Sequence, residues 1–271
     1  MNTESSNSEN VYSILSQTQR LRISDGEIKP VLDGCSNASH LLVLIWSQLG
    51  DFDNLEYAWW LQKEKSKLEA KGITIRAIGI GDRNSGIKFC NYTRFPQEWL
   101  FVDSSAEIHA DLKLYRGLNI NFPLLSTSQK AWLNLMLMCA GIGSPGTLRE
   151  VFRGYKGDKN APQLIADEEV ISGTPLPPIK GSSFKAAGGT GFQRPFELAT
   201  LRLRNMTEVL SNWNTYVPNS AYLTQRGATF LFDSQRKLIY QHRDLLAAAL
   251  RYRGILGFAE NKSNPLSFLS L

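Results

Sequence analysis

The 271-residue chain has few cysteines and histidines and no long hydrophobic run. The three cysteines, Cys35, Cys90 and Cys139, are odd in number and have no CxxC spacing, which argues against a disulfide framework and indicates a reducing compartment such as the cytoplasm. The three histidines have no ligand spacing, so we expect no metal site. The longest apolar runs, 41–46 and 135–142, are much shorter than the roughly 18 residues of a membrane span.

The charge excess is also small. Lys and Arg total 30 against 25 for Asp and Glu, and no basic run is present, so we expect no nucleic-acid partner. A hydrophobic fraction of 42% excludes disorder of the whole chain. The length fits two domains or one domain with an insertion. The first ten residues are polar and lack the apolar stretch of a secretory signal, which predicts a flexible tail over 1–20.

Apolar runs and helical patterns alternate along the first half of the chain. We predict strands over 40–46, 73–80 and 99–102, and helices over 51–71, 85–93 and 106–115. Order returns near the C-terminus, where the pattern predicts an amphipathic helix over 196–213, a hairpin of strands 228–232 and 237–242, and a helix over 244–253. This alternation predicts an α/β fold with a largely parallel sheet.

Residues 118–195 interrupt that rhythm and are interpreted as an insertion. We predict helices over 129–140 and 148–155, followed by a Pro/Gly/Ser-rich loop over 174–191. The glycines at 141–146 match GxGxxG, but a helical pattern rather than a strand precedes them, so they are interpreted as a helix end. We therefore expect no nucleotide and no other cofactor.

Three segments resemble one known family. The run IWSQLGDFD (45–53) lies where a thioredoxin has the end of its strand and the start of its active-site helix. The run KFCNYTRFP (88–96) is similar to a helix of AhpC/TSA-type proteins, and RGATFLFD (226–233) looks like a peroxiredoxin strand. In this order they resemble the peroxiredoxin-like elaboration of the thioredoxin fold. The resemblance implies a central mixed sheet flanked by helices over 21–271, interrupted by the insertion.

The resemblance also locates a site whose sulfur is missing. Ser47 matches the hydroxyl position of Thr/Ser-x-x-Cys, Gly50 falls on the peroxidatic cysteine, and Gly50 and Asp53 occupy the two positions of CxxC. Arg226 matches an arginine that supports the peroxide pocket. Peroxide reduction needs a thiolate, which a helix N-terminus would stabilise. We therefore predict a non-catalytic interaction, assembly or regulatory factor.

Simpler roles are open for each residue of this site. Asp53 and Glu56 have the spacing of a capping box, in which Asp53 stabilises the helix start, although a functional carboxylate is an alternative. Ser47 is expected to be a turn hydroxyl rather than part of a working site. Without a thiolate, Arg226 is expected to form a structural ion pair or to face solvent.

A second hypothesis is a weak thiol-dependent antioxidant or redox sensor that uses Cys35 or Cys90. Cys35 lies in a Gly/Ser/Asn loop and is expected to be exposed, whereas Cys90, beside two aromatic residues, is expected to be a buried structural thiol. A third hypothesis is a binding module whose pocket lies over the Gly50 turn, flanked by Arg226.

The resemblance carries an expectation about cellular context as well. Peroxiredoxin-like proteins of this type are common in cyanobacteria and plastids, which implies a cytoplasmic or stromal location with at most peripheral contact to photosynthetic membranes. We expect a protein partner, bound through residues 118–195.

Overall fold

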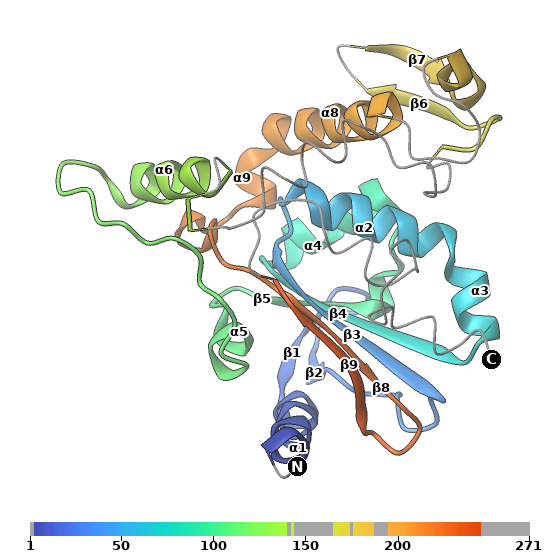
Figure 1. Ribbon diagram of the computed structural model, residues 1–271, viewed down its shortest axis with the longest axis vertical. Coiled ribbons are helices and arrows are strands. Elements are labelled where there is room, and N and C mark those ends of the chain that lie inside the picture. The colour runs from blue at the N-terminus through green and yellow to red at the C-terminus, as the bar shows by residue number, and fades with distance from the viewer. Residues whose placement is uncertain (1–2, 140–141, 144–164, 174–175, 187–194, 245–271) are drawn as a thin grey trace.

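A seven-stranded mixed sheet organises the chain, with the order β2-β1-β5-β4-β3-β8-β9 (Figure 1). The computed structural model describes residues 3–139, 142–143, 165–173, 176–186 and 195–244. The strands of the sheet are β1 Gln19–Arg22, β2 Ile28–Pro30, β3 His40–Gln48, β4 Ile73–Ile80, β5 Leu100–Asp103, β8 Ala228–Phe232 and β9 Leu238–Arg243. Strands β3, β4 and β5 pair in parallel, and the other neighbours are antiparallel.

Strand β3 runs through the middle of the sheet and is covered on both faces. Its apolar run is continuous because each face meets a separate core. One core receives Leu42, Leu44 and Trp46, and the other receives Leu41, Val43 and Ile45. The predictions of strands at 40–46 and 73–80 and of the hairpin at 228–242 are confirmed to within two residues.

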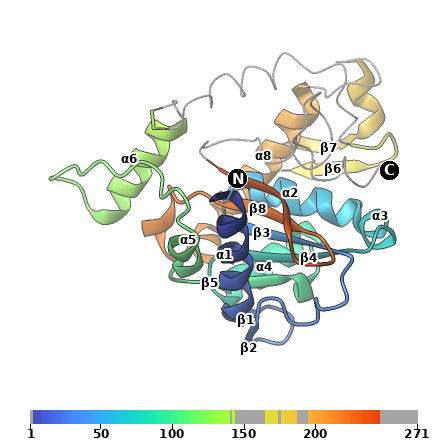
Figure 2. The same cartoon turned by 60° about the horizontal axis from the view of Figure 1, so that its bottom comes forward.

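Helices cover the two faces of the sheet (Figures 1 and 2). Residues of α2 and α4 belong to the core around Trp46, and residues of α1 and α5 belong to the other core. The helices are α1 Thr3–Gln17, α2 Phe52–Lys63, α3 Lys65–Ala70, α4 Arg83–Thr93, α5 Glu107–Asp111, α6 Thr127–Cys139, α8 Pro195–Ser211 and α9 Trp213–Tyr216, with short 3-10 turns η1 Gln97–Trp99, η2 Gly181–Ala186 and η3 Ser220–Tyr222.

Several predicted helices differ in extent. The predicted helix over 51–71 is divided at Glu64 into α2 and α3. The helix predicted over 106–115 is shorter, because Ala106 and Lys113 adopt left-handed backbone conformations with φ of 52° on either side of α5. The amphipathic helix predicted over 196–213 is confirmed as α8, which begins at Pro195 and ends at Ser211.

The segment expected to be a flexible tail over 1–20 contains regular structure in its described part. Residues 3–17 form α1 and β1 begins at Gln19, and Val11 and Leu15 are buried in the core beside β3. Their i, i+4 spacing places both side chains on one helix face. The apolar face is short and follows a run of polar residues, so the sequence pattern did not indicate a helix here.

Residues 118–195 contribute two parts outside the main sheet. Helix α6 projects from one side of the molecule, and a two-stranded sheet of β6 Val170–Gly173 and β7 Leu176–Lys180 packs on α8 (Figure 1). The expected loop over 174–191 is therefore partly β7 and η2. The helices predicted over 148–155 and 244–253 and most of the 141–146 motif lie outside the described residues. None of the helices in the described ranges is long and apolar enough to cross a membrane.

Candidate functional site

The end of β3 and the start of α2 hold a hydrogen-bonded network of polar side chains. Asp51 is the N-cap of α2, and its Oδ1 accepts from the backbone N–H of Asp53 at 3.1 Å. The buried Ser47 hydroxyl donates to Asp51 Oδ2 at 2.7 Å, and Asn54 Nδ2 donates to Ser47 Oγ at 3.0 Å and to the carbonyl of Gln48 at 2.8 Å. These bonds fix the turn that connects strand to helix.

Arg226 reaches this network from the segment before β8. Its backbone N–H donates to the carbonyl of Tyr115 at 2.9 Å, and its side chain is only 3% exposed. Nη1 lies 3.7 Å from Asp51 Oδ2, Nη2 lies 4.0 Å from Met138 Sδ, and Nε has no hydrogen-bond partner among the described residues. A buried guanidinium needs a counter-charge, and Asp51 is the acid that supplies it within the described residues.

The space beside Gly50 is filled by the chain itself. A Cβ at this position would lie 2.7 Å from Val217 Cγ2, 3.1 Å from Tyr216 Cβ and 3.4 Å from Val209 Cγ1. The first distance is below ordinary van der Waals contact. The hypothesis of an open pocket directly over the Gly50 turn is therefore wrong on the side where a side chain would lie.

The chemistry available to this network is limited. Ser47 and Asp51 have the spacing of a nucleophile and a base, but Ser47 is buried and its oxygen already accepts from Asn54. A carboxylate can accept a proton and a guanidinium can bind an anion, but neither these groups nor a serine hydroxyl can take the part of a thiolate toward peroxide.

Comparison with known proteins identifies the fold family. The sequence profile described as AhpC/TSA antioxidant enzyme matches residues 60–245, which is more than half of the chain. The chain belongs to the AhpC/TSA family. This confirms the peroxiredoxin-like resemblance and the α/β fold with a mixed sheet that it implies. The largely parallel sheet expected from the alternation of elements is wrong, since in the seven-stranded sheet only β3–β4 and β4–β5 pair in parallel. No curated protein matches the chain. The match begins after the turn at 47–53, so membership does not depend on that turn.

The acid of this network is one that the sequence did not single out. Ser47 donates to the Asp51 carboxylate and Arg226 pairs with it, whereas the expected site positions included Asp53 and not Asp51. The prediction that Asp53 caps the helix is wrong, since α2 begins at Phe52 and Asp53 lies in its first turn. Aspartate directly before the first helical residue is a favoured N-cap, so this signal was present in the sequence. The expectation that Arg226 forms an ion pair is confirmed.

Among the described residues, neither candidate thiol of this AhpC/TSA family member has a hydrogen bond to Ser47, Asp51 or Arg226. Cys35 and Cys90 are each 3% exposed and belong to the cores on opposite faces of the sheet. Burial raises the pKa of Cys35, although Arg76 and Arg236 oppose the shift, and burial raises the pKa of Cys90 to about 12. The expectation of an exposed Cys35 is wrong, and that of a buried Cys90 is confirmed. The side chain of Cys139 lies outside the described residues.

The loop that carries Cys35 is held down by two arginines. Arg236 donates to the carbonyls of Cys35 at 2.8 Å and Ala38 at 3.1 Å, and Arg76 donates to the carbonyl of Asp33 at 2.6 Å. Cys35 Sγ is directed to the same Asp33 carbonyl at 3.7 Å. Within the described ranges, no group of three or more His, Cys, Asp or Glu side chains is placed to hold a metal ion.

A buried carboxyl lies one turn further along α2. Glu56 lies on α2 near α8, in the neighbourhood of Arg202, Arg204 and Asp53. Burial raises its pKa from about 4.5 to about 7; the Arg202 charge opposes this shift and the Asp53 charge adds to it. At neutral pH this residue is therefore divided between its neutral and charged forms.

This carboxyl should make the stability of the fold pH-dependent. Because the folded state binds the proton more tightly, the contribution of Glu56 is full below about pH 4.5 and is lost as the pH rises through about 7. We expect the unchanged chain to lose roughly 2 kcal/mol of stability between pH 5 and pH 8 through Glu56, and we expect Glu56→Gln to abolish this loss. Urea unfolding at both pH values measures this. The same change at the exposed Glu69 should leave the pH profile as it is, and an unchanged profile in Glu56→Gln would contradict the assignment.

Proposed function

We propose that this AhpC/TSA family member does not reduce peroxide and acts as an interaction, assembly or regulatory factor. The single observation that supports this most is the Asp51 carboxylate beside the buried Arg226, where the resemblance leads one to expect a thiolate. The family's cationic group is already neutralised by a side chain that peroxide does not oxidise. The filled space beside Gly50 supports the same conclusion.

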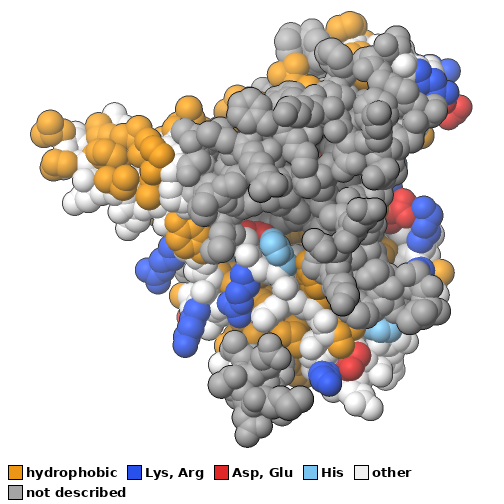
Figure 3. All heavy atoms as spheres, viewed as in Figure 1, with side chains coloured by type: hydrophobic (Ala, Val, Ile, Leu, Met, Phe, Trp, Pro, Cys, Tyr) orange, Lys and Arg blue, Asp and Glu red, His pale blue; other side chains and the backbone are white. Residues whose placement is uncertain are grey.

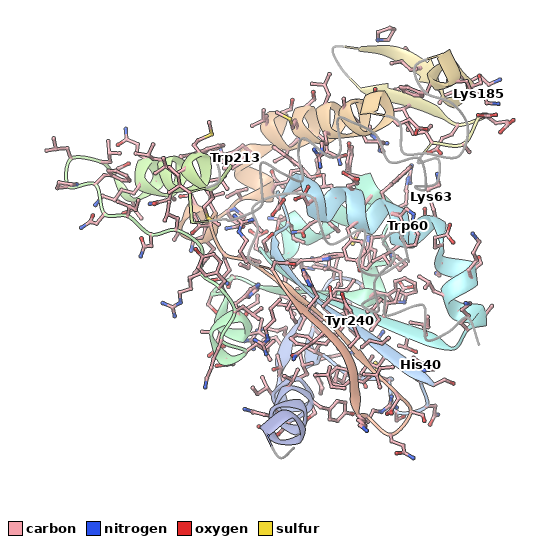
Figure 4. The ribbon with its side chains drawn as sticks, in the orientation of Figure 1. His40, Trp60, Lys63, Lys185, Trp213 and Tyr240 are labelled. Carbon is pink, nitrogen blue, oxygen red and sulfur yellow. The ribbon has the colours of Figure 1, made fainter. Side chains whose placement is uncertain are left out.

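The partner region in this proposal is the segment 118–195. It supplies the projecting helix α6 and the small β6–β7 sheet, both of which lie outside the main sheet (Figure 1). The small sheet is tied to the body through Lys63, whose Nζ pairs with Glu169 at 2.8 Å (Figure 4). We further propose a cytoplasmic or stromal setting, as the family resemblance suggests.

A peroxide assay on the purified full chain tests the proposal. With hydrogen peroxide and dithiothreitol, we expect no saturable turnover and no peroxide-dependent loss of free thiols at Cys35 and Cys90, because burial raises the pKa of both. Turnover that disappears in Cys35→Ser or Cys90→Ser would overturn the proposal in favour of a thiol antioxidant. Turnover unaffected by both changes would overturn it in favour of another peroxidatic group.

A further inference from the structure

An apolar arm projects from the body of the molecule. We use this name for residues 118–138, which form the loop 118–126 and most of α6. Hydrophobic side chains gather on the arm in the space-filling view, and Lys and Arg side chains lie on the face beneath it (Figure 3). Leu124 in the loop is 96% exposed, and Met136 on α6 is 59% exposed.

Helix α6 is apolar on both its inner and its outer side. Trp132 and Leu135 pack against the core, and Met138 is fully buried. Met136 is exposed, and Leu133 and Leu137 are partly exposed. A helix that is hydrophobic all round is normally covered on every side. The outer side of the apolar arm therefore has the character of a docking surface.

The arm is held in a defined shape. The buried Asn134 on α6 bridges to the loop, since its Nδ2 donates to the carbonyl of Ile120 at 3.0 Å and its Oδ1 accepts from the Ile120 N–H at 2.8 Å. Trp132 packs against Trp213 of α9 with ring centroids 4.7 Å apart (Figure 4). A preformed surface has less conformational entropy to lose on binding than a flexible loop.

The charges on and beside the arm indicate the charge of the surface to which it can bind. Residues 118–138 contain no Asp or Glu and one cation, Lys130. Lys130 and Arg116 line a hollow of about 410 Å³ between the base of the arm, α5 and η3. The acid in this hollow, Glu107, is paired with Arg20 at 2.9 Å. Exposed apolar side chains therefore lie on the arm, and Arg116 and Lys130 lie on the side that lines the hollow.

We propose that the apolar arm docks on an anionic lipid bilayer, with Leu124 and Met136 entering the interface and Arg116 and Lys130 facing lipid phosphates. Apolar side chains flanked by cations bind such interfaces through buried area and headgroup attraction. A second copy of the chain is a less favourable partner, because its Arg116 and Lys130 would lie against the Arg116 and Lys130 of the first copy and repel them. This inference deepens the proposed interaction role, on which it rests, by assigning a partner surface.

Vesicle sedimentation of the full chain tests the docking. We expect binding to vesicles of phosphatidylcholine and phosphatidylglycerol in equal parts, little binding to phosphatidylcholine alone, and release by salt. Leu124→Glu and Met136→Glu should each weaken binding at least about tenfold, since each removes a buried apolar side chain and adds a repelled charge. Arg116→Gln and Lys130→Gln should each weaken it about fivefold.

The matched control is Ile28→Glu, the same kind of change at a side chain 70% exposed on β2, far from the arm. We expect it to bind vesicles as the unchanged chain does, with thermal unfolding confirming that every variant is folded. Absence of vesicle binding, or equal binding by Leu124→Glu, would overturn the docking. A chain that binds no vesicles but forms a dimer that Leu124→Glu abolishes would also overturn it. Loss of all vesicle binding on addition of inorganic phosphate would overturn it as well.

The peroxide assay separates this inference from the function on which it rests. A chain that binds vesicles and also turns over peroxide would refute the proposed non-catalytic role and leave the docking surface in place. A chain that does neither would leave the non-catalytic role in place and refute the lipid surface.

Discussion

Replacing Asp51 with alanine should lower the free energy of unfolding by roughly 3 kcal/mol, the lower end of the range for a buried ion pair that loses one partner, because the Asp51 side chain is 23% exposed. The change leaves Arg226, whose side chain is 3% exposed, without the carboxylate that faces it. It also removes the acceptor of the Ser47 hydroxyl and the cap of α2. Urea unfolding curves of the two proteins measure the difference as a shift in midpoint.

A second helix start in the same chain separates the cap from the charge. Asp82 caps α4 by accepting from the Ser85 N–H at 2.8 Å, and it forms no ion pair with a buried arginine in the part of the chain that the structure describes. Asp82→Ala should therefore cost only about 1 kcal/mol. Asp51→Asn keeps a capping side chain and should fall between the two. If Asp51→Ala cost no more than Asp82→Ala, the ion pair with Arg226 would contribute nothing.

Arg226→Met in the Asp51→Ala background extends this test. Once the counter-charge is gone, removing the cation should restore part of the lost stability, because an apolar pair avoids the cost of burying an uncompensated charge. Further destabilisation by the second change would show that Arg226 is held by contacts other than Asp51.

The central sheet could be predicted from sequence because its signals are local. The run 40–46 has no polar residue after His40, and this is typical of a strand covered on both faces. The hairpin of β8 and β9 follows from two short apolar segments around a polar turn. In each case, the residues that determine the element lie within it.

The network around Asp51 could be predicted only in part because its decisive contact is non-local. Asp51 and Asp53 are both good N-caps by residue type, and the sequence near them does not choose. The contact that singles out Asp51 is its ion pair with Arg226, which is distant along the chain and is brought near by the pairing of β8 with β3. The family resemblance predicted Ser47 and Arg226 as site residues, but it did not predict an acid at position 51.

The prediction that Cys35 is exposed failed for a related reason. A loop of Gly, Ser and Asn residues is normally a surface loop, and the residues flanking Cys35 satisfy that pattern. Arg236 and Arg76 bind the loop carbonyls and hold it against the core, so the thiol points inward. Both arginines come from other strands or turns, so no window of sequence around Cys35 contains the cause of its burial.

Restoring the missing thiol with Gly50→Cys should not restore peroxide reduction. The new Cβ would lie 2.7 Å from Val217 Cγ2, so we expect overpacking to cost about 1–3 kcal/mol. Adding Val217→Ala makes room and should recover part of that stability. The carboxylate of the next residue, Asp51, already pairs with Arg226, so we expect that the guanidinium is not free to stabilise a thiolate.

Alkylation rates as a function of pH show whether that carboxylate is what keeps the thiol inactive. In Gly50→Cys/Val217→Ala we expect slow reaction with iodoacetamide at pH 7. Adding Asp51→Asn frees Arg226 to stabilise the thiolate at the N-terminus of α2, and each unit by which the thiol pKa falls should raise the rate up to about tenfold. Equal rates with and without Asp51→Asn would mean that Arg226 is not available to the thiol. Fast reaction in Gly50→Cys alone would mean that neither packing nor charge closes this position. The test therefore separates a site that lost only its sulfur from one whose packing and charge have been rebuilt around an acid.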